Sequence, residues 1–234
     1  MDKDRCNNII TIDGPAGSGK STVAKILARD LGFKYIDTGA MYRAITLIAI
    51  RNNIGLEDEA SILDKVGDVD IEMESTASDS SAYTRLSIDG EDVTDQIRSP
   101  EVGAAVSIVS RLSGVRKYLV SIQRKLAGEG RAVLEGRDTG SVVCPGAVLK
   151  VFLTASVCER VNRRKLQLQG KNQKIDTGAI KNEIKTRDKI DSSRKDSPLV
   201  LPENGIEIDT SDMTIDEVVK EIKRLYYDRT KTEI

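Results

Sequence analysis

A segment near the start of the chain has the residue types and spacing that hold phosphate groups. Positions 14–21 are Gly-Pro-Ala-Gly-Ser-Gly-Lys-Ser and match the pattern G-x-x-x-x-G-K-[ST] in full. The glycines let the main chain wrap around an anion, so that successive N–H groups point at it. In such a loop Lys20 reaches the β- and γ-oxygens, and the Ser21 hydroxyl ligates Mg²⁺. We therefore predict that a nucleoside triphosphate is bound by Gly14, Pro15, Ala16, Gly17, Ser18, Gly19, Lys20, Ser21 and Thr22.

Two further segments place polar side chains where predicted strands end. The run Asp37-Thr-Gly-Ala-Met-Tyr-Arg43 follows the second predicted strand, and Gly136-Arg137-Asp138 follows the third. In an open α/β sheet, the carboxyl ends of the strands face the ligand crevice. The phosphate loop alone does not separate transfer of the terminal phosphate to water from transfer to a second substrate. These two segments favour a second substrate, because they supply hydroxyl and guanidinium groups beside the triphosphate.

A later helical segment carries Arg187, Asp191 and Arg194, which are spaced by four and three residues and share one face. Taken alone, this trio is typical of a solvent-exposed ion-pair stripe. Beside the strand-end motifs, it is also a candidate for holding a ligand.

The preceding helical segment carries three arginines on one face, close to a glycine-containing loop at Gln169-Gly170. Basic helix faces are usually solvated, whereas a mobile lid would deliver such arginines to a phosphoryl group. We adopt the lid interpretation and predict a catalytic role for Lys20, Arg137, Arg160, Arg163 and Arg164.

Apolar strands alternate with amphipathic helices around these motifs, which predicts a parallel sheet covered by helices. The segment 70–93 differs, because its alternation and its Asp89-Gly90 turn favour a small antiparallel hairpin sheet. The fold class is therefore α/β, with a parallel five-stranded core sheet and a β insert. Core strands are predicted at 8–13, 34–37, 132–135, 148–153 and 205–209. Helices are predicted at 19–31, 41–52, 100–111, 115–128, 156–169, 179–193 and after a capping box at 214–217.

The amino-acid composition limits which binding partners and which cellular compartment we expect for this chain. The 234 residues carry 36 basic and 37 acidic side chains, so no global field favours nucleic acid. The chain has no histidine, which excludes a Ser-His-Asp triad and a histidine general base. Three scattered cysteines, Cys6, Cys144 and Cys158, indicate reduced thiols. We find no signal-like or transmembrane segment, and we predict a cytoplasmic protein without a membrane partner.

Two other classes of nucleotide-binding protein lack their motifs in this sequence. A GTPase would carry a guanine-reading Asn/Thr-Lys-x-Asp motif, and none is present. A motor-type ATPase would carry an apolar strand ending in Asp-Glu, whereas residues 132–138 are Ala-Val-Leu-Glu-Gly-Arg-Asp. These absences, together with the second set of polar side chains, favour a small kinase.

From Ile9 to about Tyr226 the chain resembles the bacterial cytidylate kinase family. The motifs that carry the resemblance are residues 12–21, 37–43, 136–138, Leu166-Gln-Leu-Gln169 and the helix of Arg187, Asp191 and Arg194. The resemblance implies ATP as phosphoryl donor, CMP and dCMP as acceptors, Mg²⁺ as cofactor, and a monomer.

The resemblance also implies a nucleoside-monophosphate-kinase fold in a single domain, 1–234. Its core would comprise residues 1–66, 94–155 and 196–234. A monophosphate-binding insert would lie at about 67–93, and a short lid with the following helix at about 156–195.

Site roles are likewise implied by the resemblance. Thr38 would contact the acceptor nucleotide, where many relatives have serine, and Asp191 would bond the sugar hydroxyls. The acceptor phosphate would be held by Arg43, Arg137 and Arg187, and the base surrounded by Ser107, Arg116, Asp138 and Arg194. Such groups suit cytosine, whose amino group needs an acceptor and whose N3 and O2 need donors. Uracil inverts this pattern at N3 and the 4-position and would leave buried polar groups unpaired.

Three alternatives stay open on sequence grounds. The same core could phosphorylate another small acceptor such as AMP, UMP or shikimate. A nucleotide-binding switch without an acceptor is a second possibility. A nucleic-acid-binding module is the third, and the neutral charge balance and the scarcity of aromatic residues argue against it.

Overall fold

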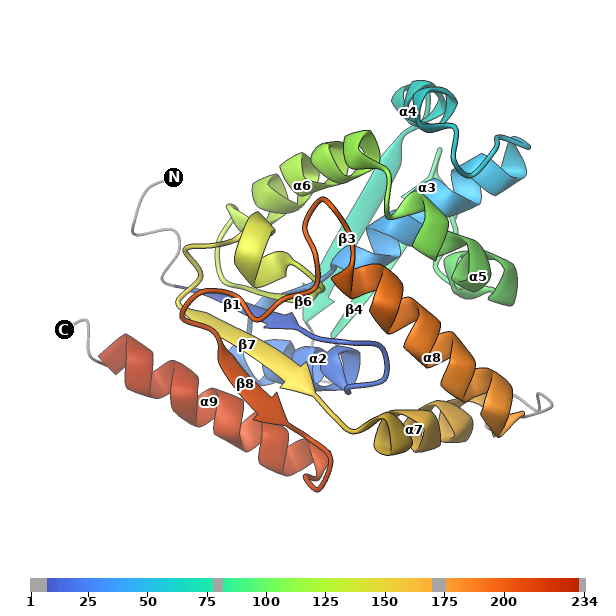
Figure 1. Cartoon of the computed structure of the whole chain (residues 1–234). Coiled ribbons are helices and arrows are strands. Elements are labelled where there is room, and N and C mark those ends of the chain that lie inside the picture. Colours follow the sequence, from blue (N-terminus) through green and yellow to red (C-terminus); the bar gives the residue numbers. More distant parts are fainter. Residues whose placement is uncertain (1–7, 78–81, 170–175, 232–234) are drawn as a thin grey trace.

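Five parallel strands form the central sheet, in the order β2-β6-β1-β7-β8 (Figure 1). The computed structural model describes residues 8–77, 82–169 and 176–231. The five-stranded parallel core predicted from the sequence is therefore confirmed. The strands are β1 Ile9–Asp13, β2 Lys34–Asp37, β6 Ala132–Gly136, β7 Leu149–Thr154 and β8 Ile206–Asp209.

Strand register brings the carboxyl ends of β1, β2 and β6 together. β1 pairs with β6 so that Asp13 lies opposite Gly136, and β2 pairs with β6 so that Asp37 lies opposite Glu135. The loops that follow these strands therefore start at one level, at the carboxyl edge of the sheet, where open α/β sheets bind ligands.

Helices cover both faces of the sheet, because the strands are apolar on both sides. Ile10 and Ile12 of β1 pack with α2 and α9, whereas Ile9 packs on the other side with Val120 of α6. The helices are α2 Lys20–Leu31, α3 Thr38–Arg51, α4 Glu59–Gly67, α5 Pro100–Val109, α6 Ser113–Ala127, α7 Val157–Gln169, α8 Thr177–Ser192 and α9 Ile215–Lys231.

The predicted antiparallel hairpin forms a separate three-stranded sheet, β3 Ile71–Ala77, β4 Ala82–Ile88 and β5 Glu91–Asp92. Asp89 and Gly90 form its tight turn, with φ values of 50° and 78°, as expected for a two-residue hairpin loop. The small sheet lies against the edge of the central sheet, where the Thr84 hydroxyl donates to Tyr35 O at 3.3 Å.

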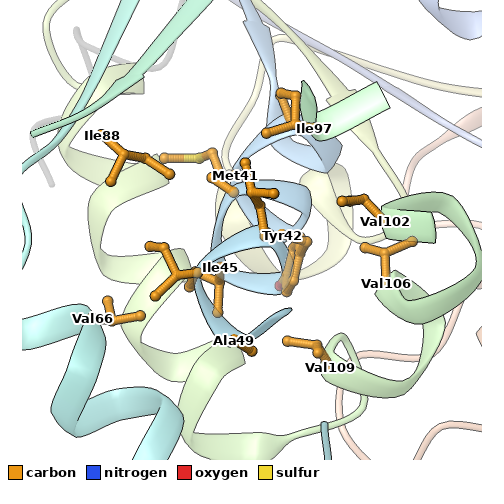
Figure 2. Packing of buried hydrophobic residues seen from close by; sticks show 14 of the residues in the cluster. Met41, Tyr42, Ile45, Ala49, Val66, Ile88, Ile97, Val102, Val106 and Val109 are labelled. Atoms are coloured by element: carbon orange, nitrogen blue, oxygen red, sulfur yellow. The ribbon is translucent and has the colours of Figure 1, made fainter. Parts of the chain in front are cut away.

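A large apolar cluster joins α3 to its neighbours, and Figure 2 shows part of it. Met41 and Ile45 of α3 pack with Val66 of α4 and Ile88 of β4. On the other side of the helix, Tyr42 faces α5, whose apolar contacts are Val102, Val106 and Val109. The cluster therefore fixes α5 relative to α3, and both helices reach the site described below.

Helices α7 and α8 lie beyond the carboxyl ends of β7 and β1 (Figure 1). They are joined by a small apolar cluster of Val161, Ile180 and Ile184. Most of the loop expected at Gln169-Gly170 lies outside the described residues, which resume at position 176. In the described part of the chain, no helix has the length and apolar character needed to cross a bilayer.

Candidate active site

The phosphate loop joins β1 to α2, and its main chain depends on glycine. Gly14 has φ 148°, and a Cβ atom there would lie 2.0 Å from Leu153 O. Gly17 and Gly19 have φ values of 80° and 91°, in the left-handed region that favours glycine. Helix α2 then begins at Lys20, so the N–H groups of its first turn face the loop.

Lys20 is buried, and among the described residues its ammonium group bonds within the loop. Nζ donates to Pro15 O at 2.7 Å and to Ser18 Oγ at 3.4 Å. Burial, followed by the positive charge of Arg137, lowers the pKa of Lys20 well below its usual value. An anion in the loop would stabilise the charged form, so the site favours a phosphate next to Lys20.

Glu135 lies beside Ser21 at the end of β6. Its Oε2 accepts a hydrogen bond from Ser21 Oγ at 2.7 Å, and its Oε1 accepts one from the Tyr35 hydroxyl. The Glu135 side chain is almost completely buried. Burial and the nearby Asp37 carboxylate raise the pKa of Glu135, although the two hydrogen bonds act in the opposite direction. A hydroxyl and a carboxylate are the hard oxygen donors that suit Mg²⁺.

Arg43 and Arg187 face the loop from α3 and α8. In the described part of the chain, neither guanidinium makes a hydrogen bond or an ion pair. Burial lowers the pKa of Arg187 to about 10, and Arg137 and Arg43 add to this shift. Burial also lowers the pKa of Arg43. Partly buried cations without a direct ion-pair partner form a ready site for an anion.

Asp191 is 2% exposed and joins two arginines. Its Oδ2 accepts from Arg137 Nε at 2.7 Å, and its Oδ1 accepts from Arg194 Nη2. Burial raises the pKa of Asp191, but the charges of Arg137 and Arg194 outweigh it and hold the pKa below the usual value. Arg187 and Asp191 of α8, together with Arg194 just beyond its end, are therefore partly buried around the site and do not form a solvent-exposed ion-pair stripe.

A second buried ion pair lies deeper in the cavity. Arg116 of α6 donates through Nη2 to Asp138 Oδ2 at 2.6 Å and through Nη1 to Ser110 O at 2.9 Å. The Arg116 guanidinium also lies over the ring of Tyr42, 5.3 Å from its centroid. Ser110 Oγ accepts from Arg194 at 3.0 Å, which links this pair to Asp191 and its arginine partners.

Asp13 anchors the turn that carries Arg137 and Asp138. Its carboxylate accepts from Thr139 N at 2.9 Å, from Thr139 Oγ1 at 2.8 Å and from Gly140 N at 2.7 Å. Burial raises the pKa of Asp13, and these hydrogen bonds partly offset the shift. The end of β1 thus holds the loop after β6 in place.

These elements enclose one continuous cavity of about 290 Å³. It runs from the phosphate loop, past the arginines of α3 and α8, to α5 and α6. Most of the site residues predicted from the sequence line it, namely Ala16, Gly17, Gly19, Lys20, Ser21, Thr22, Thr38, Arg43, Ser107, Arg116, Arg137, Asp138, Arg164, Arg187, Asp191 and Arg194.

The other predicted residues do not line the cavity. Gly14, Pro15 and Ser18 shape the loop from behind. Arg160 is buried and bonds to Ala155 O at 3.1 Å, Ala16 O at 3.2 Å and Asp188 Oδ2 at 2.7 Å. The guanidinium of Arg163 bonds to Glu159 and Thr210. Of the three lid arginines, only Arg164 reaches the cavity, and the catalytic role of all three stays a prediction.

Several lining residues were missed from the sequence: Asp37, Tyr42, Arg98, Ser110, Glu135, Gln167 and Glu183. Asp37 and Glu135 lie at the ends of predicted strands and Tyr42 lies in the motif that follows Asp37, so a signal for all three was available in the sequence. Arg98 and Ser110 carry no such signal, because tertiary packing alone brings their segments to the cavity. None of the described residues between 67 and 93 lines it, so the monophosphate-binding role of this insert stays a prediction.

A parallel sheet with a glycine-rich phosphate loop, facing a second set of arginines across one cavity, defines a phosphate-loop kinase. The family model for cytidylate kinase matches residues 10–228. The chain is 49% identical to a cytidylate kinase of Caldanaerobacter subterraneus subsp. tengcongensis, over 96% of this chain and 97% of that protein. It is 47% identical to one of Pelotomaculum thermopropionicum, over 91% and 93%. The chain belongs to the cytidylate kinase family.

A third relative, a cytidylate kinase of Desulfitobacterium hafniense, is 46% identical over 95% of this chain and 94% of its own length. Among solved structures, a gluconokinase from Sinorhizobium meliloti 1021 aligns with a TM-score of 0.48 and 16% identity, over 97% of this chain and 96% of that chain. At that level no conclusion about this chain follows from it.

Proposed function

We propose that this chain transfers the γ-phosphoryl group of ATP to the phosphate of CMP, with dCMP as a second acceptor. The observation that carries the proposal is the pair Arg43 and Arg187. Among the described residues neither guanidinium has an ion-pair partner, and both face the same cavity as the phosphate loop. Family membership supports cytidine monophosphate as the acceptor that they hold.

On the donor side, the loop from Gly14 to Thr22 holds the triphosphate of ATP. Main-chain N–H groups bind the β-phosphate, and Lys20 exchanges its bond to Pro15 O for the β- and γ-oxygens. Ser21 would ligate Mg²⁺, and its hydroxyl donates to Glu135 Oε2. When bound, Mg²⁺ neutralises charge on the β- and γ-oxygens.

On the acceptor side, Arg43, Arg137 and Arg187 hold the CMP phosphate. Asp191 hydrogen-bonds the sugar hydroxyls, and Thr38 contacts the nucleotide from the start of α3. The base lies against the deeper residues Ser107, Arg116, Asp138 and Arg194, where Ser110 and Tyr42 also line the wall.

The chemical step needs no general base. The acceptor phosphate is ionised at neutral pH, and one of its oxygens attacks the γ-phosphorus in line. The bond from that phosphorus to the β,γ-bridging oxygen breaks, the bridging oxygen keeps the electron pair, and ADP and CDP result. The residues contribute positioning and charge neutralisation, with Lys20 and Arg137 beside the transferred group and Arg160, Arg163 and Arg164 delivered by lid closure.

We assign a core to residues 1–66, 94–155 and 196–234, an insert to about 67–93, and the lid with its following helix to about 156–195. We further propose that the chain is a monomer and that it acts in the cytoplasm, in pyrimidine nucleotide metabolism.

An acceptor panel tests this function. ADP formation from ATP and Mg²⁺ would be measured with CMP, dCMP, UMP, AMP and shikimate. We expect kcat/KM to be highest for CMP and dCMP. A higher kcat/KM for another acceptor would mean that the chain phosphorylates a different substrate. ATP consumption that does not depend on any acceptor would favour a nucleotide switch.

A further inference from the structure

Tyr35 does not line the cavity, yet its hydroxyl reaches the residue that faces Ser21. The side chain is fully buried on β2 and donates to Glu135 Oε1. Glu135 Oε2 accepts from Ser21 Oγ at 2.7 Å. Tyr35, Glu135 and Ser21 therefore form a chain of hydrogen bonds that runs from an edge strand to the phosphate loop.

We propose that Tyr35 is a positioning residue of the donor site, which orients the Glu135 carboxylate toward Ser21. With Oε1 occupied by Tyr35, the carboxylate presents Oε2 to the Ser21 proton. A hydroxyl that donates in this direction keeps its oxygen lone pairs for a cation. Hydrogen bonds one step removed from a metal ligand commonly set its orientation and affinity. The inference rests on the proposed function only in taking Mg²⁺ and a nucleotide as the ligands of the loop.

Three elements hold Tyr35 in this place. Lys25 of α2 lies over its ring, with Nζ 5.6 Å from the centroid. Thr84 of β4 donates to Tyr35 O, and β2 pairs Tyr35 with Val133 of β6. The small antiparallel sheet thereby supports the donor site from behind, although its described residues do not touch the cavity. A positioning group needs such support to be effective.

Calorimetric titration of the full chain with ADP tests the proposal, once with Mg²⁺ and once with EDTA. The ratio of the two dissociation constants is the Mg²⁺-dependent gain in affinity. In Tyr35→Phe we expect this gain to fall by about 10-fold, the low end for loss of such a partner. Affinity in EDTA should stay as in the wild type, because no phosphate contact has been removed.

Tyr226→Phe is the matched control. It also removes a hydroxyl from a buried ring, one that donates to Asn8 at the opposite end of the sheet. This variant should keep the wild-type gain. An unchanged gain in Tyr35→Phe would overturn the proposal, and so would an equal loss of ADP affinity with and without Mg²⁺, which a general structural defect would produce.

A double variant tests whether Tyr35 acts through Glu135. In a Glu135→Ala background there is no carboxylate to orient, so adding Tyr35→Phe should cause no further loss of the gain. A further loss would overturn the proposal. This comparison also holds if the single Tyr35→Phe variant is too unstable to titrate. ADP binding involves no acceptor, so a failed acceptor panel and a failed Tyr35 test are distinguishable.

Discussion

At the residue scale, the proposed mechanism uses the positive charge of Lys20 at the transferred phosphate. Without a ligand, its ammonium bonds to Pro15 O, and burial disfavours its charge. We predict that Lys20→Ala lowers kcat at least ~100-fold, the order attached to losing one donor to the transition state. Steady-state kinetics with saturating CMP would measure this. Lys220→Ala, which removes an exposed lysine of α9, should leave kcat unchanged. Wild-type turnover in Lys20→Ala would remove Lys20 from the mechanism.

The ion pairs of Asp191 should make the free energy of unfolding depend on pH. Its folded pKa lies below the usual value, because Arg137 and Arg194 outweigh the effect of burial. The stability it contributes is therefore present above the unfolded pKa of about 4 and is lost as pH falls through the folded pKa. Urea unfolding between pH 7 and pH 2 should show a smaller acid loss for Asp191→Asn than for the wild type.

The exposed Asp64→Asn variant serves as the control for this measurement. Between pH 7 and pH 2 it should lose the same free energy of unfolding as the wild type. If Asp191→Asn and the wild type lost the same free energy of unfolding on acidification, the ion pairs of Asp191 would not stabilise the fold as the geometry indicates.

Individual site residues could be predicted from the sequence where a motif fixes the local backbone geometry. The phosphate loop was predicted residue by residue, because only glycine tolerates its φ values and the spacing sets where Lys20 lies. Glu135 was noted only as a strand end, since its contact with Ser21 spans 114 positions in sequence. The partners of Arg160 could not be predicted either, because they depend on how α7 and α8 pack together.

At the scale of elements, the capping box of α9 makes a testable contribution. Thr214 N and Oγ1 each donate to Glu217 Oε2 at 2.8 Å, and Glu217 N donates to Thr214 Oγ1 at 3.3 Å. Thr214→Ala should lower the free energy of unfolding by about 1 kcal/mol, measured by urea denaturation. The cavity lies elsewhere, so kcat/KM should not change.

Thr214→Ser keeps the capping hydroxyl and should be close to wild type in stability. If the Ser and Ala variants lost the same free energy of unfolding, the cap would not be the cause.

Element boundaries show where local signals suffice. The Ser99-Pro100 start of α5 was predicted, and Ser99 Oγ accepts from Val102 N at 3.3 Å. Helix α3 was expected from Met41 but begins at Thr38, because the Asp37 side chain accepts from Ala40 N and caps it. Helix α4 was missed. Its cap, Asp58 with Ser61, was visible in the sequence, but the helix is short and buries only Ile62 and Val66.

For the whole molecule, the alternation of strands and helices predicted a parallel sheet, and that was correct. The order β2-β6-β1-β7-β8 was not predicted, because strand neighbours depend on contacts distant in sequence. The cavity is a consequence of that order. β1 and β6 are adjacent, so the phosphate loop and the Arg137 turn start side by side.

The central claim is that one cleft holds two nucleotides, the donor by main-chain amides and the acceptor by arginines. A crystal structure of the chain with ADP and CMP bound tests it most directly. We predict the CMP phosphorus within hydrogen-bonding reach of Arg43, Arg137 and Arg187, with the ADP β-phosphate in the loop of Gly14–Ser21. Those three guanidinium groups turned toward bulk solvent, away from any phosphate, would contradict the account.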